Sequence, residues 1–128
     1  NYGNLGNVYY SRGELDKAVE YHQKALTLHE GLGGKEGMAT NYGNLGNVYY
    51  SRGELDKAVE YFQNALTLNE GLGSKEGMAQ NYGNLGIVYE QQSHKEKAKQ
   101  AYQKSVDLFK VLGNPTEVKK VQALLDSL

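Results

Sequence analysis

Residues 41–80 read NYGNLGNVYYSRGELDKAVEYFQNALTLNEGLGSKEGMAQ, and residues 1–40 carry the same sequence with five substitutions. A third copy opens at Asn81 with NYGNLG, then diverges and ends near Lys120. The repeat period is therefore 40 residues. A period between about 20 and 50 residues is typical of solenoids and propellers, whose units bury their apolar faces against one another and usually need about three copies for stability.

Each repeat predicts two α-helices. Successive residues of a helix are about 100° apart, and at this spacing Tyr2, Leu5 and Tyr9 share one face. The alternation of a β-strand would instead put the adjacent residues Tyr9 and Tyr10 on opposite faces, which argues against a strand. After the sequence SRG at 11–13, apolar residues continue at three- and four-residue spacing as far as Leu32, which predicts the second helix.

Glycines divide the chain into units. Gly13 and Gly53 stand where a left-handed residue would end the first helix, and the Leu-Gly pairs at 32–33, 72–73 and 112–113 stand where the second would end. We expect units at 1–34, 35–74 and 75–114, then a capping helix at 115–128 with Pro115 at its first position. The sequence thus predicts an all-α protein, an α-solenoid of three antiparallel helix pairs plus a C-terminal capping helix. Because the chain begins inside its first predicted helix, we expect a fragment of a longer array.

The second copy carries a motif of Tyr-x-x-Leu-Gly-x-x-Tyr followed by glycine, alanine, an aromatic residue and alanine at fixed spacings. Its residues are Tyr42, Leu45, Gly46, Tyr49, Gly53, Ala58, Phe62 and Ala65. This pattern resembles the tetratricopeptide repeat. His22 departs from it in the first copy, and Ser93 and Ser105 depart from it in the third. The usual period is about 34 residues, with a proline where Glu30 and Glu70 stand here, and this longer form resembles the repeats of kinesin light chains and Leu-Gly-Asn-repeat adaptors. The resemblance implies stacked helix pairs and a non-enzymatic role in protein interaction.

The composition excludes several classes of function. The chain has no cysteine, so it forms no disulfide and offers no thiolate to a metal and no cysteine nucleophile. Fourteen Lys and Arg against fifteen Asp and Glu give a net charge of -1, far from the concentrated positive charge that binding to nucleic acids or anionic membranes requires. No apolar run approaches the ~20 residues of a membrane span. We therefore expect a cytoplasmic protein with neither a nucleic-acid nor a membrane partner.

No catalytic constellation emerges from the sequence. His22 and His29 could share a helix face and bind a metal, but the second copy has Phe62 and Asn69 at these positions. A metal site also needs oriented third and fourth ligands. The favoured interpretation therefore places His22 at the edge of the core and His29 in solvent. We expect no enzyme, no cofactor and no metal.

One polar stripe recurs on the face opposite the core. The predicted site residues are Asn4, Asn7, Tyr10, Asn44, Asn47, Tyr50, Asn84 and Glu90. In stacked helix pairs the first helices line the inner curve, so this stripe would form a ladder along a groove. Asparagine both donates and accepts hydrogen bonds, which suits the backbone of an extended peptide. The alternative is a solvated helix face, but asparagine is a mediocre helix former and Lys or Glu would serve solubility better.

Some peptide-binding tetratricopeptide domains grip a C-terminal carboxylate with a clamp of Lys, Asn, Asn, Lys and Arg. By resemblance, Asn7 and Asn44 match the two asparagines of this clamp. Gly3, Gln80 and Asn84 stand where its three cations should be. The clamp is incomplete, which argues against the recognition of chaperone tails.

The sequence supports two hypotheses about function. The leading hypothesis is a protein-interaction scaffold that binds an extended or helical segment of a protein or peptide partner in its concave groove, with Tyr10 and Tyr50 as flat anchors. The alternative is a structural self-assembly module that forms a homo-oligomer through its open N-terminal end, around Tyr2, Leu5 and Val8.

Overall fold

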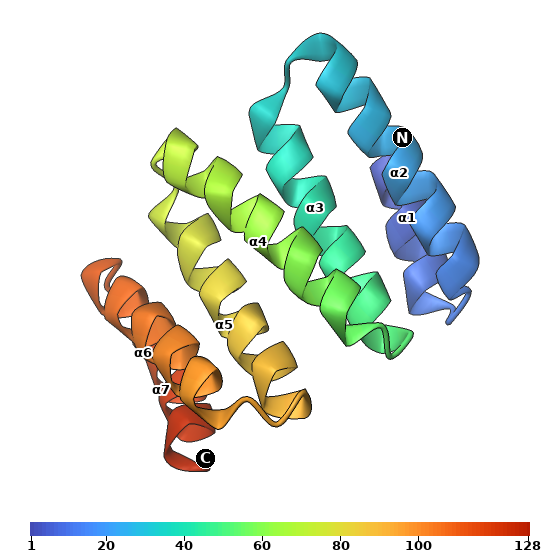
Figure 1. The fold of residues 1–128 in the computed structure, drawn as a ribbon. Coiled ribbons are helices and arrows are strands. Elements are labelled where there is room, and N and C mark those ends of the chain that lie inside the picture. The colour runs from blue at the N-terminus through green and yellow to red at the C-terminus, as the bar shows by residue number, and fades with distance from the viewer. The chain divides into compact units, whose positions relative to one another are not determined.

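The computed structural model describes all 128 residues and contains seven α-helices and no β-strand. The helices are α1 (Tyr2–Ser11), α2 (Leu15–Leu32), α3 (Lys35–Ser51), α4 (Leu55–Leu72), α5 (Lys75–Gln91), α6 (Lys95–Val111) and α7 (Pro115–Asp126) (Figure 1). The expected all-α class, helix pairs followed by a capping helix, is confirmed. The chain forms two compact units, Asn1–Leu68 and Asn69–Leu128, with their boundary inside α4.

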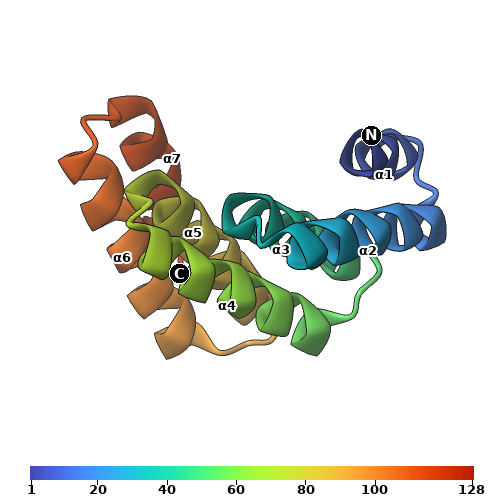
Figure 2. The same ribbon diagram turned by 90° about the horizontal axis from the view of Figure 1, so that it is seen from above.

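In the first unit α2 packs against both α1 and α3 (Figure 2). Inside each helix pair a ring of the second helix lies against a glycine of the first. A β-carbon on Gly46 would lie 2.7 Å from the ring of Phe62, and one on Gly6 would lie 2.7 Å from the ring of His22. Glycine costs up to about 1 kcal/mol inside a helix, and here the close approach of the two helices offsets that cost.

The expectation that His22 lies at the edge of the core is wrong. Its side chain is only 1% exposed, because it takes the place in α2 that the fully buried Phe62 takes in α4. Burial in apolar surroundings lowers the pKa of His22 below its usual value of 6.5. Its Nδ1 atom has no hydrogen-bond partner in the protein.

The turns inside the helix pairs share one backbone geometry. Gly13 and Gly53 have φ angles of 77° and 78°, in the left-handed region that glycine enters without strain. Ser93 holds the aligned position between α5 and α6 at φ 64° and is the only residue other than glycine with a positive φ. The predicted helix stops are therefore confirmed, and the third pair makes the same turn at a steric cost.

The helices that follow each helix pair, α3, α5 and α7, begin with caps of different quality. The side chain of Ser74 accepts a hydrogen bond from the backbone N–H of Gly77 at 3.2 Å, and Asn114 accepts one from Glu117 at 3.1 Å. Pro115 follows at the first helical position of α7, as expected. Gly34 stands at the start of α3 and offers no side chain to cap it.

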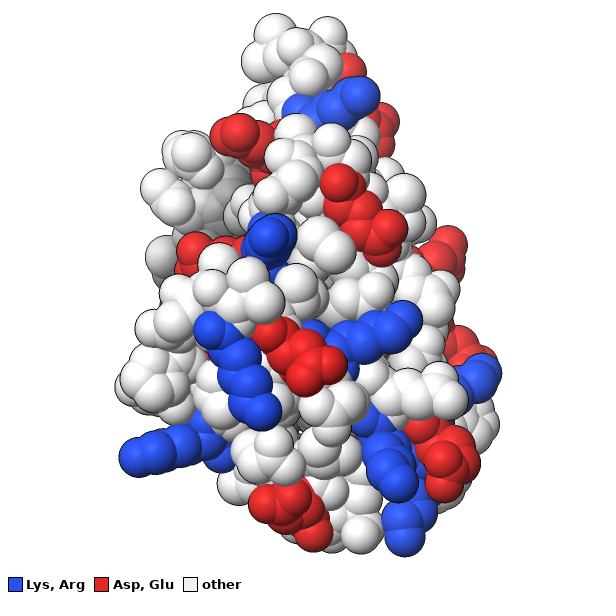
Figure 3. Space-filling model, turned by 90° about the vertical axis from the view of Figure 1, so that its left-hand side faces the viewer, with Lys and Arg blue, Asp and Glu red and all other residues white.

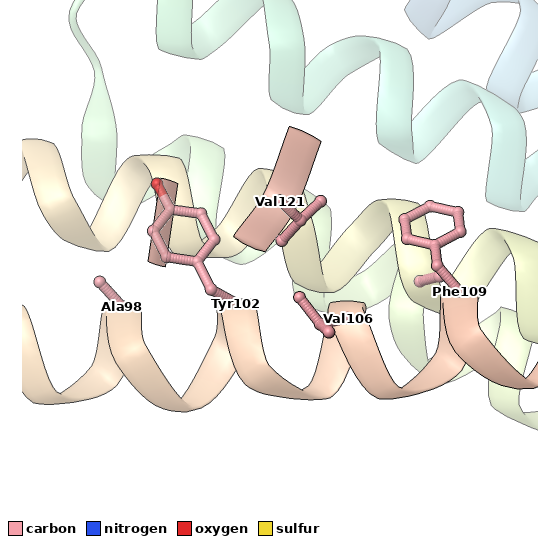
Figure 4. Close-up of a cluster of buried hydrophobic side chains, with 6 residues drawn as sticks. Ala98, Tyr102, Val106, Phe109 and Val121 are labelled. Atoms are coloured by element: carbon pink, nitrogen blue, oxygen red, sulfur yellow. The ribbon is translucent and has the colours of Figure 1, made fainter. Parts of the chain in front are cut away.

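The core of the second unit lies between α5, α6 and α7. Its buried members are Ala79, Ala98, Tyr102, Val106, Phe109 and Val121. In Figure 4 the side chains of Tyr102, Val106 and Phe109 extend from α6 toward the neighbouring helices, and Val121 of α7 lies among them. Val118, Leu124, Leu125 and Leu128 pack around this cluster, so α7 covers α6 with its apolar side.

Candidate functional site

A polar cavity of about 240 Å³ opens in the first unit between α1 and α3, with α2 as its floor. Its lining consists of Asn1, Gly3, Asn4 and Asn7 of the first helix region, Ala25 and His29 of α2, and Gly37, Thr40, Asn41 and Asn44 of α3. Three of the predicted site residues, Asn4, Asn7 and Asn44, therefore line one cavity. Five asparagine side chains around so small a space present both donors and acceptors to whatever enters it.

Asn41 is the buried acceptor of this cavity. Its side chain is 4% exposed, and its Oδ1 atom has no hydrogen-bond partner in the protein. The equivalent atom in the next repeat is satisfied, because Asn69 donates from Nδ2 to Oδ1 of Asn81 at 2.7 Å. His29 occupies the position of Asn69 in the first repeat. A buried acceptor without a partner costs about 1–3 kcal/mol, so this atom favours a ligand that donates a hydrogen bond.

The expectation that His29 is a solvated residue is wrong. Its ring lies against the backbone of α3, so closely that a β-carbon on Gly37 would lie 2.4 Å from ring atoms. The side chain is partly buried and forms part of the cavity floor. A glycine at position 37 is what lets the ring reach this place.

The other predicted site residues have different surroundings. Tyr10 and Ser51 join α1 to α3 through their hydroxyl groups at 2.8 Å. Asn47 and Tyr50 lie on α3 outside the lining of the cavity. Glu90 of α5 is exposed and accepts a hydrogen bond from the hydroxyl of Tyr102 at 2.8 Å. The structure thus brings together three asparagines of the stripe, Asn4, Asn7 and Asn44, and gives Tyr10 and Glu90 partners within the chain.

A second cavity, of about 380 Å³, lies in the second unit between α5, α6 and α7. Its lining is Glu76, Ala79, Gln80, Gly83, Asn84 and Ile87 of α5, Ser105 and Phe109 of α6, Asn114 at the start of α7, and Glu117, Lys120, Val121 and Leu124 of α7. Asn84 is the predicted site residue that it contains. Every lining residue of the first cavity except Asn1 has its counterpart 80 positions later in the lining of the second. The two cavities are therefore the same place in two different repeats.

Charges of both signs are mixed on the face shown in Figure 3. On the face that Figure 3 shows, Lys and Arg side chains alternate with Asp and Glu, and no large area of one sign stands out. No group of three or more His, Asp or Glu side chains converges as metal ligands would. None of the helices combines the length and the apolar character needed to cross a membrane.

Comparison with known proteins decides the family. The family model of the tetratricopeptide repeat matches residues 1–70 and again residues 37–110. The chain belongs to the tetratricopeptide-repeat family. Such repeats generally mediate protein–protein interaction and are typically not enzymes. No curated protein is similar enough in sequence to count as a relative.

Solved structures share the tetratricopeptide fold at low sequence identity. BtubC (BKLC) from P. vanneervenii is 20% identical with a TM-score of 0.76, over 99% of this chain and 64% of that one. Aspartyl phosphate phosphatase F from Bacillus subtilis is 14% identical with a TM-score of 0.92, over 97% of this chain and 33% of that one. The N-terminal domain of stress-induced protein-1 from C. elegans is 23% identical with a TM-score of 0.76, over 96% and 91%. The chain thus spans less than two thirds of the first two proteins, and these likenesses concern the fold alone.

Sequence reasoning missed part of both cavities. Asn41 stands three positions before Asn44, so helical spacing could have added it to the predicted stripe. His29 carried no such signal, because it occurs in one copy only. The second cavity depends on Phe109 and Val121, which read as ordinary core residues of the third unit and the cap.

Proposed function

We propose that this tetratricopeptide array is a non-enzymatic scaffold that binds a peptide segment of a protein partner along the inner faces of its first helices. The observation that carries the proposal is the buried Oδ1 of Asn41, which has no partner in a cavity lined by four further asparagines. A peptide backbone in an extended or helical segment supplies N–H donors for this atom and C=O acceptors for the neighbouring amides. Gly3 also lines this cavity, where a β-carbon would lie 3.2 Å from Oδ1 of Asn1.

The incomplete clamp agrees with a neutral mode of recognition. Asn7 and Asn44 line the cavity, whereas the lining of this cavity contains neither lysine nor arginine. Each neutral hydrogen bond contributes about 0.5–1.5 kcal/mol net, so a few of them must be joined by buried apolar contacts to reach the ~8 kcal/mol of micromolar binding.

The test is selection of binders from a phage-displayed library of random dodecapeptides on the full chain. The best peptide, synthesised with a fluorescent label, is then titrated against the wild type and against Asn44→Ala. Loss of one or two hydrogen bonds should weaken binding about two- to tenfold. Asn64→Ala, an exposed asparagine of α4 outside the cavity, is the matched control and should leave the dissociation constant unchanged. A library that yields no specific binder would contradict the proposal.

A second candidate function is self-association through the apolar side of α1. Leu5 is 40% exposed and Val8 is 49% exposed, whereas Leu45 and Val48, their identical counterparts in α3, are 0% and 1% exposed. The same side chains that form core in one repeat are thus open to solvent in another. Buried apolar area is the main driving force of association.

Sedimentation velocity over a range of concentrations tests this second function. If α1 mediates association, Val8→Lys should shift the distribution toward the monomer without loss of helical circular dichroism. Asn44→Ala should leave the distribution unchanged. An oligomer that persists unaltered in Val8→Lys would show that α1 is not the interface.

A further inference from the structure

In the cavity of the second unit, four polar residues of the first cavity are replaced by apolar ones and the rim carries charged residues instead. The changes from polar to apolar are Asn7 to Ile87, His29 to Phe109, Asn41 to Val121 and Asn44 to Leu124. Three further changes add polar or charged groups: Ala25 to Ser105, Gly37 to Glu117 and Thr40 to Lys120. Asn4 is retained as Asn84. Four polar groups that could contact a peptide backbone are therefore replaced by apolar side chains at one equivalent place.

The floor of this cavity offers little to a polar ligand. Phe109 and Val121 are 3% and 5% exposed and belong to the buried core of the unit (Figure 4). The hydroxyl of Ser105 already donates to the backbone oxygen of Ala79 at 2.8 Å. Since a polar group buried here would give up its hydrogen bonds to water without replacement, the floor favours an apolar side chain.

The size of the cavity suits part of a ligand rather than a whole one. Its volume of about 380 Å³ lies near the lower end of the roughly 300–1,000 Å³ typical of small-molecule pockets. Gly83 keeps it open, because a β-carbon there would lie 3.3 Å from the hydroxyl oxygen of Ser105. One large side chain of a peptide fits this description, with Asn84 and Gln80 beside it for the peptide backbone.

The rim adds a preference of charge. Glu76 is in the first turn of α5 and Glu117 is in the first turn of α7, and both line the same cavity. Lys120 is the one basic residue of the lining. Two carboxylates against one ammonium group favour a cationic side chain beside the apolar one.

We infer that the cavity between α5, α6 and α7 is an anchor pocket for one large aliphatic or aromatic side chain of a peptide that carries Lys or Arg next to it. The inference rests on the proposed function and names the chemistry of the partner. The pocket supplies the buried apolar contact that neutral hydrogen bonds alone do not provide.

The experiment uses the dodecapeptides selected on the full chain. The selected sequences should share a Leu, Ile, Met or Phe beside a Lys or Arg. Replacing that apolar residue of the peptide by Ser should weaken binding about tenfold or more, because the burial of a large apolar side chain is lost. This comparison leaves the protein itself unchanged.

Variants of the protein assign the effect to the pocket. Ile87→Asn installs the residue that the first two repeats carry at this position. It should weaken binding of the selected peptide about fivefold or more. The selected peptide and its Ser variant should then bind Ile87→Asn equally well. Val111→Asn makes the same kind of change at a residue that is 67% exposed and outside the lining, and should leave both dissociation constants unchanged. With the wild-type protein, exchanging the basic residue of the peptide for Gln should weaken binding. With the double variant Glu76→Gln, Glu117→Gln, the same exchange should leave binding unchanged.

Two results would overturn the inference. Selected peptides that lack an apolar anchor, and that respond to Asn44→Ala but not to Ile87→Asn, would refute the pocket while leaving the proposed function intact. A library that yields no binder at all would refute the proposed function and the pocket with it.

Discussion

Three different rings occupy one position of the helix pair. His22, Phe62 and Tyr102 lie against Gly6, Gly46 and Gly86, at 2.7, 2.7 and 2.5 Å from where a β-carbon would be. The position demands a flat side chain because the glycine leaves only a shallow space. The polar groups of the three rings differ. The hydroxyl of Tyr102 donates a hydrogen bond to the exposed Glu90, whereas Nδ1 of His22 has no hydrogen-bond partner.

A substitution at Gly46 should test this close approach. In Gly46→Ala the new β-carbon meets the buried ring of Phe62, and overpacking of a core typically costs about 1–3 kcal/mol. We expect a net loss of about 1–2 kcal/mol in the free energy of unfolding, measured by urea denaturation. Gly43→Ala in the same helix has nothing within 4 Å of its β-carbon. It should stabilise the protein by up to about 1 kcal/mol, through helix propensity alone.

His22 should make stability depend on pH. Its pKa is lowered below 6.5 by burial, so between the lowered pKa and 6.5 the unfolded chain binds a proton that the folded chain does not. The free energy of unfolding contributed by this group is therefore complete above about pH 6.5. This contribution falls as the pH is lowered from about 6.5 to the pKa of His22 in the folded state, and it is constant below that pKa. Urea midpoints at a series of pH values from 8 to 5 measure it.

The variant His22→Phe carries the ring of the second repeat and has no proton to bind. Its urea midpoint should fall less than that of the wild type as the pH is lowered, and should be higher at pH 5. His94→Asn, at an exposed position, is the control for a histidine outside the core. Parallel pH profiles for the wild type and His22→Phe would show that His22 is not the titrating group.

At the scale of elements, the turn inside each pair depends on one left-handed residue. Gly13 and Gly53 supply it in the first two pairs, and Ser93 supplies it between α5 and α6 at φ 64°. A residue with a β-carbon pays roughly 1–2 kcal/mol for this conformation. The third pair therefore keeps the turn of the others with a strained residue.

Ser93→Gly should stabilise the second unit by about 1 kcal/mol, because glycine removes the strain but loses more chain entropy on folding. The reverse change, Gly53→Ser, should destabilise the first unit by a similar amount, since its φ is 78°. Thermal unfolding followed by circular dichroism measures both. Equal melting temperatures for Ser93→Gly and the wild type would show that the turn stores no strain.

Many of the helix boundaries could be predicted from the sequence. Gly13 and Gly53 marked the helix ends because few other residues enter the left-handed region, and Pro115 marked the start of the capping helix because proline suits the first helical position. The cavities were only partly predicted. Their floors come from second helices, and a residue such as Phe109 has the same periodicity whether it fills a core or faces a pocket.

At the scale of the whole molecule, the two compact units differ in how they end. In the second unit α7 lies over α6, with Val121 inside the core and four more apolar residues around it. In the first unit the apolar side of α1 is about half exposed at Val8. The stability of the chain thus depends unequally on its terminal helices.

Deletion of residues 115–128 should unfold or aggregate the second unit. Each large apolar side chain contributes about 1.5–3 kcal/mol when fully buried, against a total stability of about 5–15 kcal/mol for a typical domain. Loss of Val121 and its neighbours also exposes the Phe109 side chain that they cover. The measurement is thermal unfolding by circular dichroism with light scattering, and Lys119→Ala, an exposed change in α7, is the control. A truncated chain that melts at the wild-type temperature would refute the role of α7.

The glycines of the first helices also govern the order in which the chain can fold as it leaves the ribosome. α3 contains Gly37, Gly43 and Gly46, each of which costs up to about 1 kcal/mol in a helix, and helices in proteins gain most of their stability from tertiary packing. Such a helix gains its full stability only when the ring that fits its central glycine, Phe62 in this pair, has been synthesised. Folding during translation therefore advances by helix pairs, and a ribosome that stalls between the two helices of a pair leaves the first one without its partner.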